Sequence, residues 1–336
     1  MEKFKKIILA VAVSAIMPHI TNAQRSNANL KNEKTMEKVS FQNKIGITVV
    51  GNVHYPVGFD RNKKYAALVV VPPAGGAKEQ TAGLYAKKMS ENGFVAIAID
   101  GSYQGESGGE PRYKEDPIAR VEDIRAAVDY LTTMPYIDEN RIGALGICAG
   151  GGYVVSAAMT ERRIKAVASV VPVNGGRENR AQGSEATIAT LETIAKQRTA
   201  EARGEAPMIL AWIPDEYKVA DDIDLRESYE YYRTSRGANP NWQNKMRFTS
   251  LDAVMAYDAF YLVESLLTQP LKIIIGSKPG AFGSIIDGND LYKRAASKHK
   301  DIVVMEGASH FDLYDNANYV DKTVEAVKSF FDTNLK

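Results

Sequence analysis

The sequence predicts an α/β fold in which a doubly wound, mostly parallel sheet carries an inserted helical cap. Short segments rich in valine, isoleucine and alanine alternate along the chain with segments of helical period. This alternation is typical of parallel strands buried on both faces. About a hundred residues separate the predicted strand 166–171 from the next one at 271–275, and they interrupt the alternation. The 336 residues are enough for one large domain of this class.

Six short, mostly apolar runs predict buried strands. They occupy residues 66–71, 94–99, 142–145, 166–171, 271–275 and 302–305. An opening pair of strands is expected within 41–55, with a turn near Gly51 and Asn52. Helices are expected where apolar residues recur with helical period, at 79–92, 118–131 and 319–331. Gly93 is a stop signal after the first of these, and Pro117 is a start signal before the second.

The long insertion is expected to fold as the cap, because an unstructured stretch of this length is uncommon inside a compact domain. Its predicted bounds are 175–250, which leaves 38–174 and 251–336 as the core. Two helices are expected in it, at 187–203 and 225–233. Aromatic residues gather in the same segment: Trp212, Tyr217, Tyr229, Tyr231, Tyr232 and Trp242.

The N-terminus has the pattern of a secretory signal peptide. Three lysines in the first six residues precede an apolar run over 7–16, and small residues up to Ala23 offer a cleavage site. We therefore expect residues 1–23 to be removed and residues 24–37 to form a flexible lead-in. The protein is then periplasmic or secreted. The apolar run is too short for a comfortable membrane span, so no stable span is expected after cleavage.

Composition narrows the classes of function. The formal net charge is +1 and the chain has no basic stripe, so no nucleic-acid partner is expected. Cys148 is the only cysteine, which excludes an internal disulfide. No spacing of histidines, cysteines or carboxylates suggests a metal site, and no cofactor is implied. An unpaired thiol in an oxidising compartment is a chemical hazard, which indicates that this thiol has a use.

Residues 141–153, RIGALGICAGGGY, carry the chemistry. A hydrophobic strand runs into the Gly-Ile-Cys-Ala-Gly run at 146–150, and an apolar helical segment follows. This spacing is the strand-to-helix elbow of an α/β-hydrolase, with cysteine in place of serine. Glycines two residues before and after the nucleophile avoid side-chain collisions at the strained turn. The positive end of the helix dipole is expected to favour the thiolate form of Cys148.

His310 is the predicted general base. It lies between the last predicted strand and the closing helix, where an α/β-hydrolase places its histidine. The other histidines are less well placed: His19 is in the signal, His54 in the opening strands and His299 beside lysines on a helix. A nucleophile that has no base nearby to accept its proton would not be activated.

Two loops that follow parallel strands are candidate substrate sites. An acyl-transfer intermediate needs backbone donors for its oxyanion. We expect them from the N–H of Ala149 and from Ala74 or Gly75, in the loop after the first parallel strand. In the loop after the next strand, Tyr103 and Gln104 either contact the substrate or belong to a rigid turn without contact.

These motifs resemble the α/β-hydrolases of the dienelactone-hydrolase-like group, in particular bacterial members with a cysteine nucleophile. Besides the elbow, four segments carry the resemblance: GAKEQTAGLYA (76–86), DGSYQGESGG (100–109), EDPIARVEDIRAAVDYL (115–131) and GASHFDLYD (307–315). The helical insertion is similar as well. The resemblance implies a Cys–His–acid triad and hydrolysis of an ester, lactone or thioester. One departure is Pro-Pro-Ala-Gly-Gly at 72–76, where related sequences usually read His-Pro-Gly-Gly-Gly.

The acid of that triad has three candidates. Such hydrolases normally carry it just after the strand before the last, but residues 277–283 contain no carboxylate. Asp287 is the first carboxylate beyond them and Asp290 follows, although each is also a natural turn or N-cap residue. Asn174, after the preceding strand, is the third candidate, because an amide orients the histidine in papain-like proteases.

The sequence therefore predicts a periplasmic or secreted α/β-hydrolase with a small-molecule acyl substrate. Cys148 attacks a carbonyl, and His310 accepts the thiol proton and later activates water. One alternative is an acyltransferase or peptidase with the same elbow, which a water-excluding cap would favour. Another is a catalytically silent binding protein on the same fold.

Overall fold

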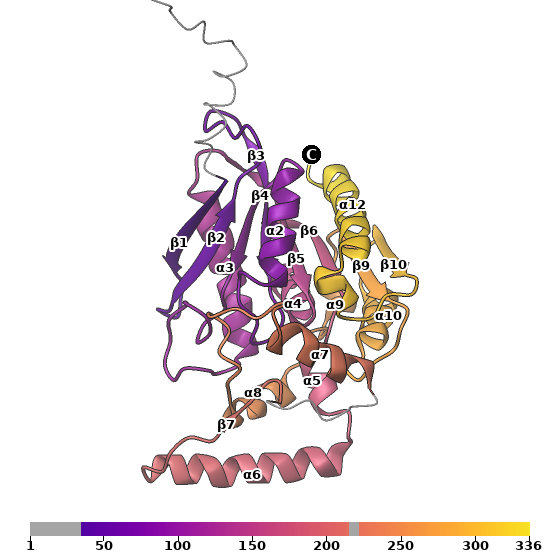
Figure 1. The fold of residues 1–336 in the computed structure, drawn as a ribbon. Coiled ribbons are helices and arrows are strands. Elements are labelled where there is room, and N and C mark those ends of the chain that lie inside the picture. The colour runs from indigo at the N-terminus through magenta and orange to yellow at the C-terminus, as the bar shows by residue number, and fades with distance from the viewer. Residues whose placement is uncertain (1–34, 215–221) are drawn as a thin grey trace, which may run out of the picture. The chain divides into compact units, whose positions relative to one another are not determined.

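An eight-stranded, mostly parallel sheet forms the centre of the fold (Figure 1). The structure is a computed structural model that describes residues 35–214 and 222–336. In sheet order the strands are β1 (Met36–Gln42), β2 (Thr48–His54), β4 (Val95–Ile99), β3 (Tyr65–Val71), β5 (Ile137–Ile147), β6 (Ile164–Val170), β9 (Leu271–Gly276) and β10 (Lys300–Met305). The β1–β2 and β2–β4 pairs are antiparallel and all other pairs are parallel. The predicted fold class is confirmed.

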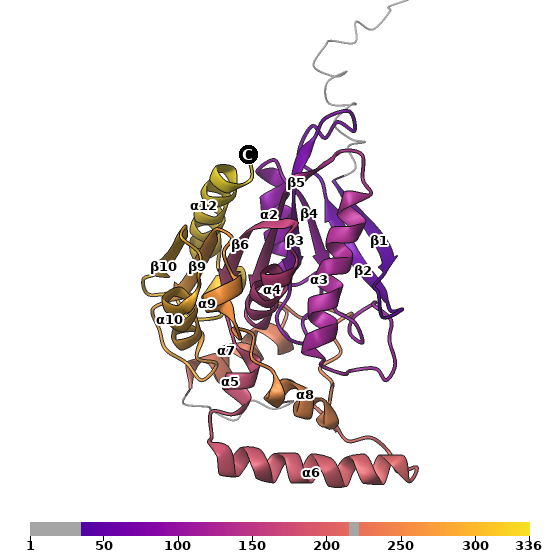
Figure 2. The same cartoon turned by 180° about the vertical axis from the view of Figure 1, so that it is seen from behind.

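Helices cover both faces of this sheet. In Figure 1 the near face carries α2 (Thr81–Glu91) and α12 (Ala317–Asn334). Figure 2, seen from behind, shows α3 (Pro117–Thr132), α4 (Ala149–Thr160) and α10 (Ser284–Arg294) on the other face. α3 begins where Pro117 predicts, because Oδ1 of Asp116 accepts from the N–H groups of Ile118 and Ala119 at 3.1 Å.

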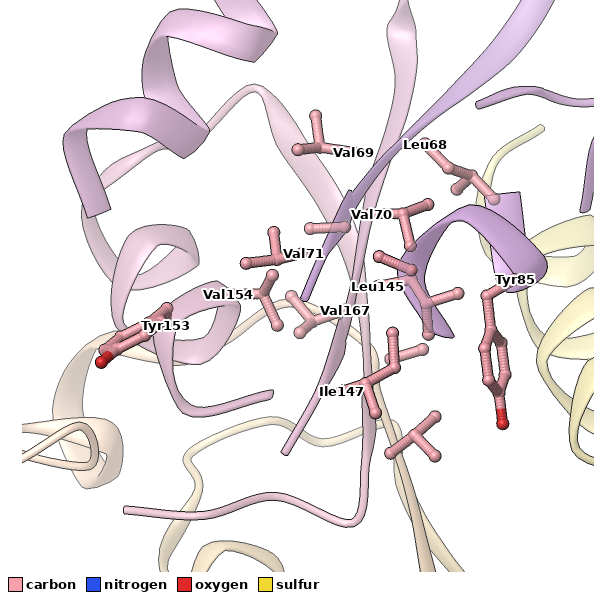
Figure 3. Packing of buried hydrophobic residues seen from close by; sticks show 14 of the residues in the cluster. Leu68, Val69, Val70, Val71, Tyr85, Leu145, Ile147, Tyr153, Val154 and Val167 are labelled. Carbon is pink, nitrogen blue, oxygen red and sulfur yellow. The ribbon is translucent and has the colours of Figure 1, made fainter. Parts of the chain in front are cut away.

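The core lies on both faces of the central strands. Figure 3 shows Leu68 and Val70 of β3 pointing toward Tyr85 of α2, whereas Val71 points toward Val154 of α4. All five side chains are buried, with at most 3% of their surface exposed. Burying one such aliphatic side chain stabilises the fold by about 1.5–3 kcal/mol. The packing on both faces therefore fixes the positions of the loops that leave the C-terminal ends of these strands.

The opening pair of strands has its turn earlier than predicted. β1 and β2 are joined at 43–47, where Oδ1 of Asn43 accepts from the backbone N–H groups two and four residues later. An asparagine that satisfies its own turn in this way sets the turn position. Gly51 and Asn52 lie inside β2 instead, so the turn predicted there is wrong. Glycine fits that position because a Cβ at Gly51 would lie 3.0 Å from the side chain of Ile97 in β4.

Residues 175–250, the predicted insertion, contain helices and a short strand pair. They are α5 (Gly175–Asn179), α6 (Ser184–Ala202), β7 (Ile209–Leu210), α7 (Ile223–Arg233), β8 (Met246–Arg247) and the 3-10 turn η2 (Phe248–Ser250). The two helices predicted there overlap α6 and α7. Figure 1 shows α6 along the side of the insertion away from the sheet, and Ile194 is its buried residue. The short helices α8 (Leu251–Ala256) and α9 (Val263–Leu266) follow before β9, and they are too short for a helical period to reveal them.

The predicted signal peptide, 1–23, lies outside the described residues, as do residues 24–34 of the predicted lead-in. Residues 36 and 37 belong to β1, so the lead-in ends earlier than predicted. Within the two described ranges, no helix combines the length and apolar character that crossing a membrane requires.

Candidate active site

Cys148 lies on a sharp turn between β5 and α4, at the C-terminal edge of the sheet. Its backbone has φ 57° and ψ −125°, a conformation that side-chain-bearing residues rarely adopt and that costs on the order of 1–3 kcal/mol. The glycines on either side are required by space. A Cβ at Gly146 would lie 2.1 Å from the carbonyl oxygen of Gly150, and a Cβ at Gly150 would lie 2.4 Å from that of Val71. The glycine spacing of the elbow thus reflects two close backbone contacts.

The thiol of Cys148 is neutral at pH 7, in contrast to the expectation from the helix dipole. The residue is 8% exposed, and burial raises the pKa of its thiol to about 12. The Tyr314 hydroxyl and the Ala149 N–H beside the sulfur lower this pKa, whereas the carboxylates of Glu178 and Asp224 raise it further. Desolvation therefore outweighs the favourable field at the N-terminus of α4.

His310 lies in the loop between β10 and the short helix α11 (Asp312–Asp315). Its ring is buried, with Nδ1 3.1 Å from Oγ of Ser284 and Nε2 3.3 Å from the hydroxyl of Tyr314. Burial lowers the pKa of His310 to about 3, so the imidazole is neutral at pH 7. When Nδ1 carries the proton and donates it to Ser284, Nε2 is a proton acceptor.

Tyr314 connects His310 to Cys148. Its hydroxyl contacts the imidazole and is also adjacent to the thiol, whose pKa it lowers. The side chain is 1% exposed, and its ring centroid lies 4.5 Å from that of Phe311. The sequence pattern did not single out Tyr314. Its signal is the spacing, because residues four positions apart on a helical turn lie on the same side.

Asp287, the first candidate for the acid, has other partners. Its carboxylate accepts from the guanidinium of Arg177 at 2.5 and 2.8 Å and from the backbone N–H of Asn174 at 2.7 Å. The hydroxyl of Ser284, rather than this carboxylate, contacts Nδ1 of His310. The position beside Nδ1 of His310, which was predicted for a carboxylate, is thus occupied by the neutral hydroxyl of Ser284. The carboxylate of the buried Asp287 pairs with Arg177 instead.

The two remaining candidates for that role also face elsewhere. Asp290 pairs with Arg294, one turn later on α10, at 2.8 Å. The side-chain amide of Asn174 donates to Asp258 at 2.7 Å and accepts from the backbone N–H of Ala259. Both residues therefore serve contacts within the fold.

The predicted oxyanion donors lie near the sulfur. The Ala149 N–H lies beside the Cys148 thiol and lowers its pKa, and Ala74 lines the same cavity as Cys148. Gly75 has φ 64°, and a Cβ there would lie 2.5 Å from the indole nitrogen of Trp212. Glycine is thus required at Gly75 by a residue of the insertion. The role of these N–H groups as oxyanion donors stays a prediction.

Tyr103 and Gln104 are both buried in the loop after β4. The Lys114 ammonium lies 5.3 Å from the Tyr103 ring centroid, and Nε2 of Gln104 lies 3.4 Å from the Lys114 carbonyl oxygen. The backbone N–H of Tyr103 donates to Gly108 and closes the loop. Neither residue is among the described residues that line the cavity beside Cys148. This geometry favours the rigid-turn alternative.

A cavity of about 340 Å³ opens beside Cys148, a size that suits a small-molecule ligand. Most of its described lining is aromatic or aliphatic. The insertion contributes Trp212, Ile213, Leu225, Tyr232, Trp242 and Met246. Two carboxylates also line it: Glu115 is engaged by Arg120, and burial raises the pKa of Glu178. Within 35–214 and 222–336, no group of three or more His, Cys, Asp or Glu side chains is arranged to hold a metal ion.

Known proteins share this architecture. Residues 55–197 match the dienelactone hydrolase family. The uncharacterised protein YcjY of Escherichia coli (strain K12) is 42% identical over 306 residues, which cover 89% of this chain and 99% of YcjY. The crystal structure of the hypothetical protein PA2218 from Pseudomonas aeruginosa has a TM-score of 0.84 at 31% identity, covering 91% of this chain and 95% of that one. A thiohydrolase of Eupenicillium brefeldianum is 23% identical, over 84% of this chain and 90% of its own.

Proposed function

Because the chain belongs to the dienelactone hydrolase family of α/β-hydrolases, we propose that it hydrolyses an ester, lactone or thioester through an acyl-cysteine intermediate on Cys148. The elbow carries this proposal. It holds one cysteine in a strained conformation beside an apolar cavity. Strain of this kind persists only where the surrounding structure enforces it, and it clusters at active sites.

In the first half of the proposed reaction, Sγ of Cys148 attacks the carbonyl carbon while the thiol proton passes to Nε2 of His310. The oxyanion is stabilised by the N–H of Ala149 and by a donor from Ala74 or Gly75. The bond to the leaving group then breaks, and the imidazolium gives its proton to the leaving oxygen or sulfur. The acyl group remains on Sγ as a thioester.

In the second half, water attacks the thioester carbon and loses a proton to Nε2 of His310. The tetrahedral intermediate collapses and expels the Cys148 thiolate, which takes this proton back. The product is a carboxylic acid and the enzyme returns to its starting state. Because the thiol and the imidazole are both neutral at rest, the proton transfer accompanies each attack rather than preceding it.

The cavity supports an apolar acyl group of modest size. Its aromatic and aliphatic lining gains about 0.8 kcal/mol for each methylene that it buries. The relative named as a thiohydrolase supports the inclusion of thioesters among the substrates.

The test uses residues 24–336 with para-nitrophenyl esters of increasing acyl length, a lactone and an acyl thioester. We expect turnover by the wild type and a loss of about a thousandfold or more in Cys148→Ala and in His310→Ala. Intact-mass spectrometry is expected to trap the acyl group on Cys148. Unchanged turnover in Cys148→Ala would overturn the proposal. Ligand binding without turnover of any substrate would favour the silent binding protein.

We also propose that the protein acts outside the cytoplasm, after removal of residues 1–23. The lysines and the apolar run that precede Ala23 support this. Cell fractionation, with N-terminal sequencing of the recovered protein, is expected to find it in the periplasm or medium with Gln24 as its first residue. A cytoplasmic protein that retains Met1 would refute this location.

A further inference from the structure

A phenol joins the thiol and the imidazole. The Tyr314 hydroxyl lies 3.3 Å from Nε2 of His310 and is adjacent to the thiol of Cys148. Cys148 and Tyr314 both line the cavity, whereas the buried His310 is not among its described lining residues. The hydroxyl of Tyr314 therefore lies between the base and the nucleophile.

We propose that Tyr314 is a catalytic residue that relays the thiol proton of Cys148 to Nε2 of His310. The inference rests on the proposed acyl-cysteine mechanism and adds to it the path of the proton. Without the phenol, the hydroxyl of Ser284 at Nδ1 would be the one remaining hydrogen-bond partner of the His310 ring among the described residues.

The relay moves two protons and leaves the phenol neutral. As Sγ attacks the carbonyl carbon, the S–H bond breaks and its electron pair forms the S–C bond. The thiol proton bonds to the phenol oxygen of Tyr314, and the original O–H proton passes to Nε2 of His310. The imidazole becomes imidazolium, and no oxidant or reductant takes part. The reverse movement returns the proton to the leaving group.

The phenol is held in a fixed position. Its ring centroid lies 4.5 Å from Phe311 and 5.1 Å from Tyr231, which meets it edge-on at 88°. The backbone carbonyl of Tyr314 accepts from Oγ1 of Thr81 at 3.0 Å, which ties α11 to α2. The contact between Ser284 and Nδ1 holds the imidazole from the opposite side. A relay needs this rigidity, because both hydrogen bonds must exist at the moment of attack.

The charge states of the three groups suit a concerted transfer. Burial raises the pKa of Tyr314 far above its ordinary value, so the phenol does not hold a negative charge as an intermediate. The neighbouring thiol and imidazole are neutral at rest as well. A neutral chain of donors therefore leads from Cys148 to His310.

The decisive variant is Tyr314→Phe, which removes the hydroxyl and keeps the ring. Its matched control is Tyr231→Phe, which removes a buried hydroxyl from a ring packed on Tyr314. Acylation is measured as the para-nitrophenol burst in a stopped-flow instrument. We expect a loss of about a hundredfold in Tyr314→Phe and less than threefold in Tyr231→Phe. The double variant Tyr314→Phe with His310→Ala is expected to be no slower than His310→Ala alone, because both changes interrupt one path.

A second measurement needs only the wild type and does not depend on a variant that folds. The acylation rate in mixtures of H2O and D2O is expected to curve downward with deuterium fraction, because two protons move together. Acylation by Tyr314→Phe within fivefold of the wild type would overturn the relay, as would a linear dependence on deuterium fraction. Turnover that survives Cys148→Ala would instead defeat the acyl-cysteine mechanism itself, so the two failures are distinguishable.

Discussion

At the scale of single residues, burial determines how Cys148 reacts. With a thiol pKa of about 12, on the order of one thiol in 10⁵ is ionised at pH 7. We predict that iodoacetamide labels Cys148 slowly at neutral pH and that the rate rises about tenfold per pH unit up to about pH 10. Cys148 is the only cysteine, so intact-mass spectrometry reads its labelling directly. A rate that levels off below about pH 8 would show a pre-ionised thiolate instead.

A second prediction at this scale separates Ser284 from Asp287. Ser284→Ala removes the hydroxyl that contacts Nδ1 of His310, so we expect a loss of about tenfold in kcat with little change in Tm. Asp287→Asn weakens the pair with Arg177, so we expect a lower Tm, in line with a cost of roughly 3 kcal/mol for breaking a buried pair. Steady-state kinetics and thermal melts of both variants check this. A drop in kcat at unchanged Tm in Asp287→Asn would restore the carboxylate as the triad acid.

At the scale of elements, a buried cation links two loops at the C-terminal edge of the sheet. Lys78, in the loop after β3, pairs with Asp100 at 2.8 Å and Glu106 at 2.6 Å in the loop after β4. Lys78 and Asp100 are fully buried. A buried charge is tolerated when it is paired in this way, and removing one partner is strongly destabilising. These ion pairs hold the loop that contains Tyr103 and Gln104 in place, which is consistent with a rigid turn.

The start of α7 carries a buried acid that makes folding depend on pH. Asp224 is 1% exposed; its Oδ2 accepts from the Phe282 N–H, and its Oδ1 has no partner among the described residues. Burial, with Asp222 and Glu227 nearby, raises the pKa of Asp224 to about 6. The protonated form is favoured in the folded state. Its contribution to stability is therefore present below the ordinary value of 3.8 and lost as pH rises through about 6.

Asp224→Asn removes this titration. We predict that the free energy of unfolding of the variant, relative to the wild type, increases by about 3 kcal/mol from about pH 3.5 to about pH 7. Urea unfolding of both proteins across this range measures the difference, and the other carboxylates cancel in the comparison. A difference that stays constant over the range would contradict the raised pKa of Asp224.

At the scale of the whole molecule, local patterns predicted the framework and the strand-to-helix turn at Cys148. The turn at Cys148 could be predicted because its signal, a glycine two residues away on each side, lies within a segment of five residues. Ser284 and Tyr314 were not predicted, because their roles depend on contacts between segments that the sequence does not place in space. Asp287 was assigned by position along the chain, and its pair with Arg177, 110 residues away, decides its partners. The hydrophobic periodicity of a segment predicts which of its side chains are buried, whereas polar contacts between loops depend on tertiary packing.

Arg236 anchors the insertion to the loop that holds His310. Arg236 donates to both carboxylate oxygens of Asp315 at 2.6 and 2.8 Å and to the carbonyl oxygen of Phe311 at 3.0 Å. The next residue, Gly237, accepts from Nε2 of Gln80 at 2.7 Å, in the loop after β3. This segment therefore fixes both the loop of the proposed base and the neighbourhood of the proposed oxyanion donors. Bidentate pairs of this kind give geometric specificity as well as energy.

We predict that Arg236→Leu lowers kcat/KM by about tenfold, because the proposed relay requires a fixed α11. The matched control is Arg198→Leu, which breaks the exposed pair with Asp252 at 2.9 Å. An exposed pair contributes about 0–1 kcal/mol, so this control is expected to stay within about twofold of the wild type. Hydrogen exchange over residues 306–316 is expected to accelerate in Arg236→Leu alone. Faster exchange with unchanged kcat/KM would mean that the rigidity of this loop does not limit the reaction.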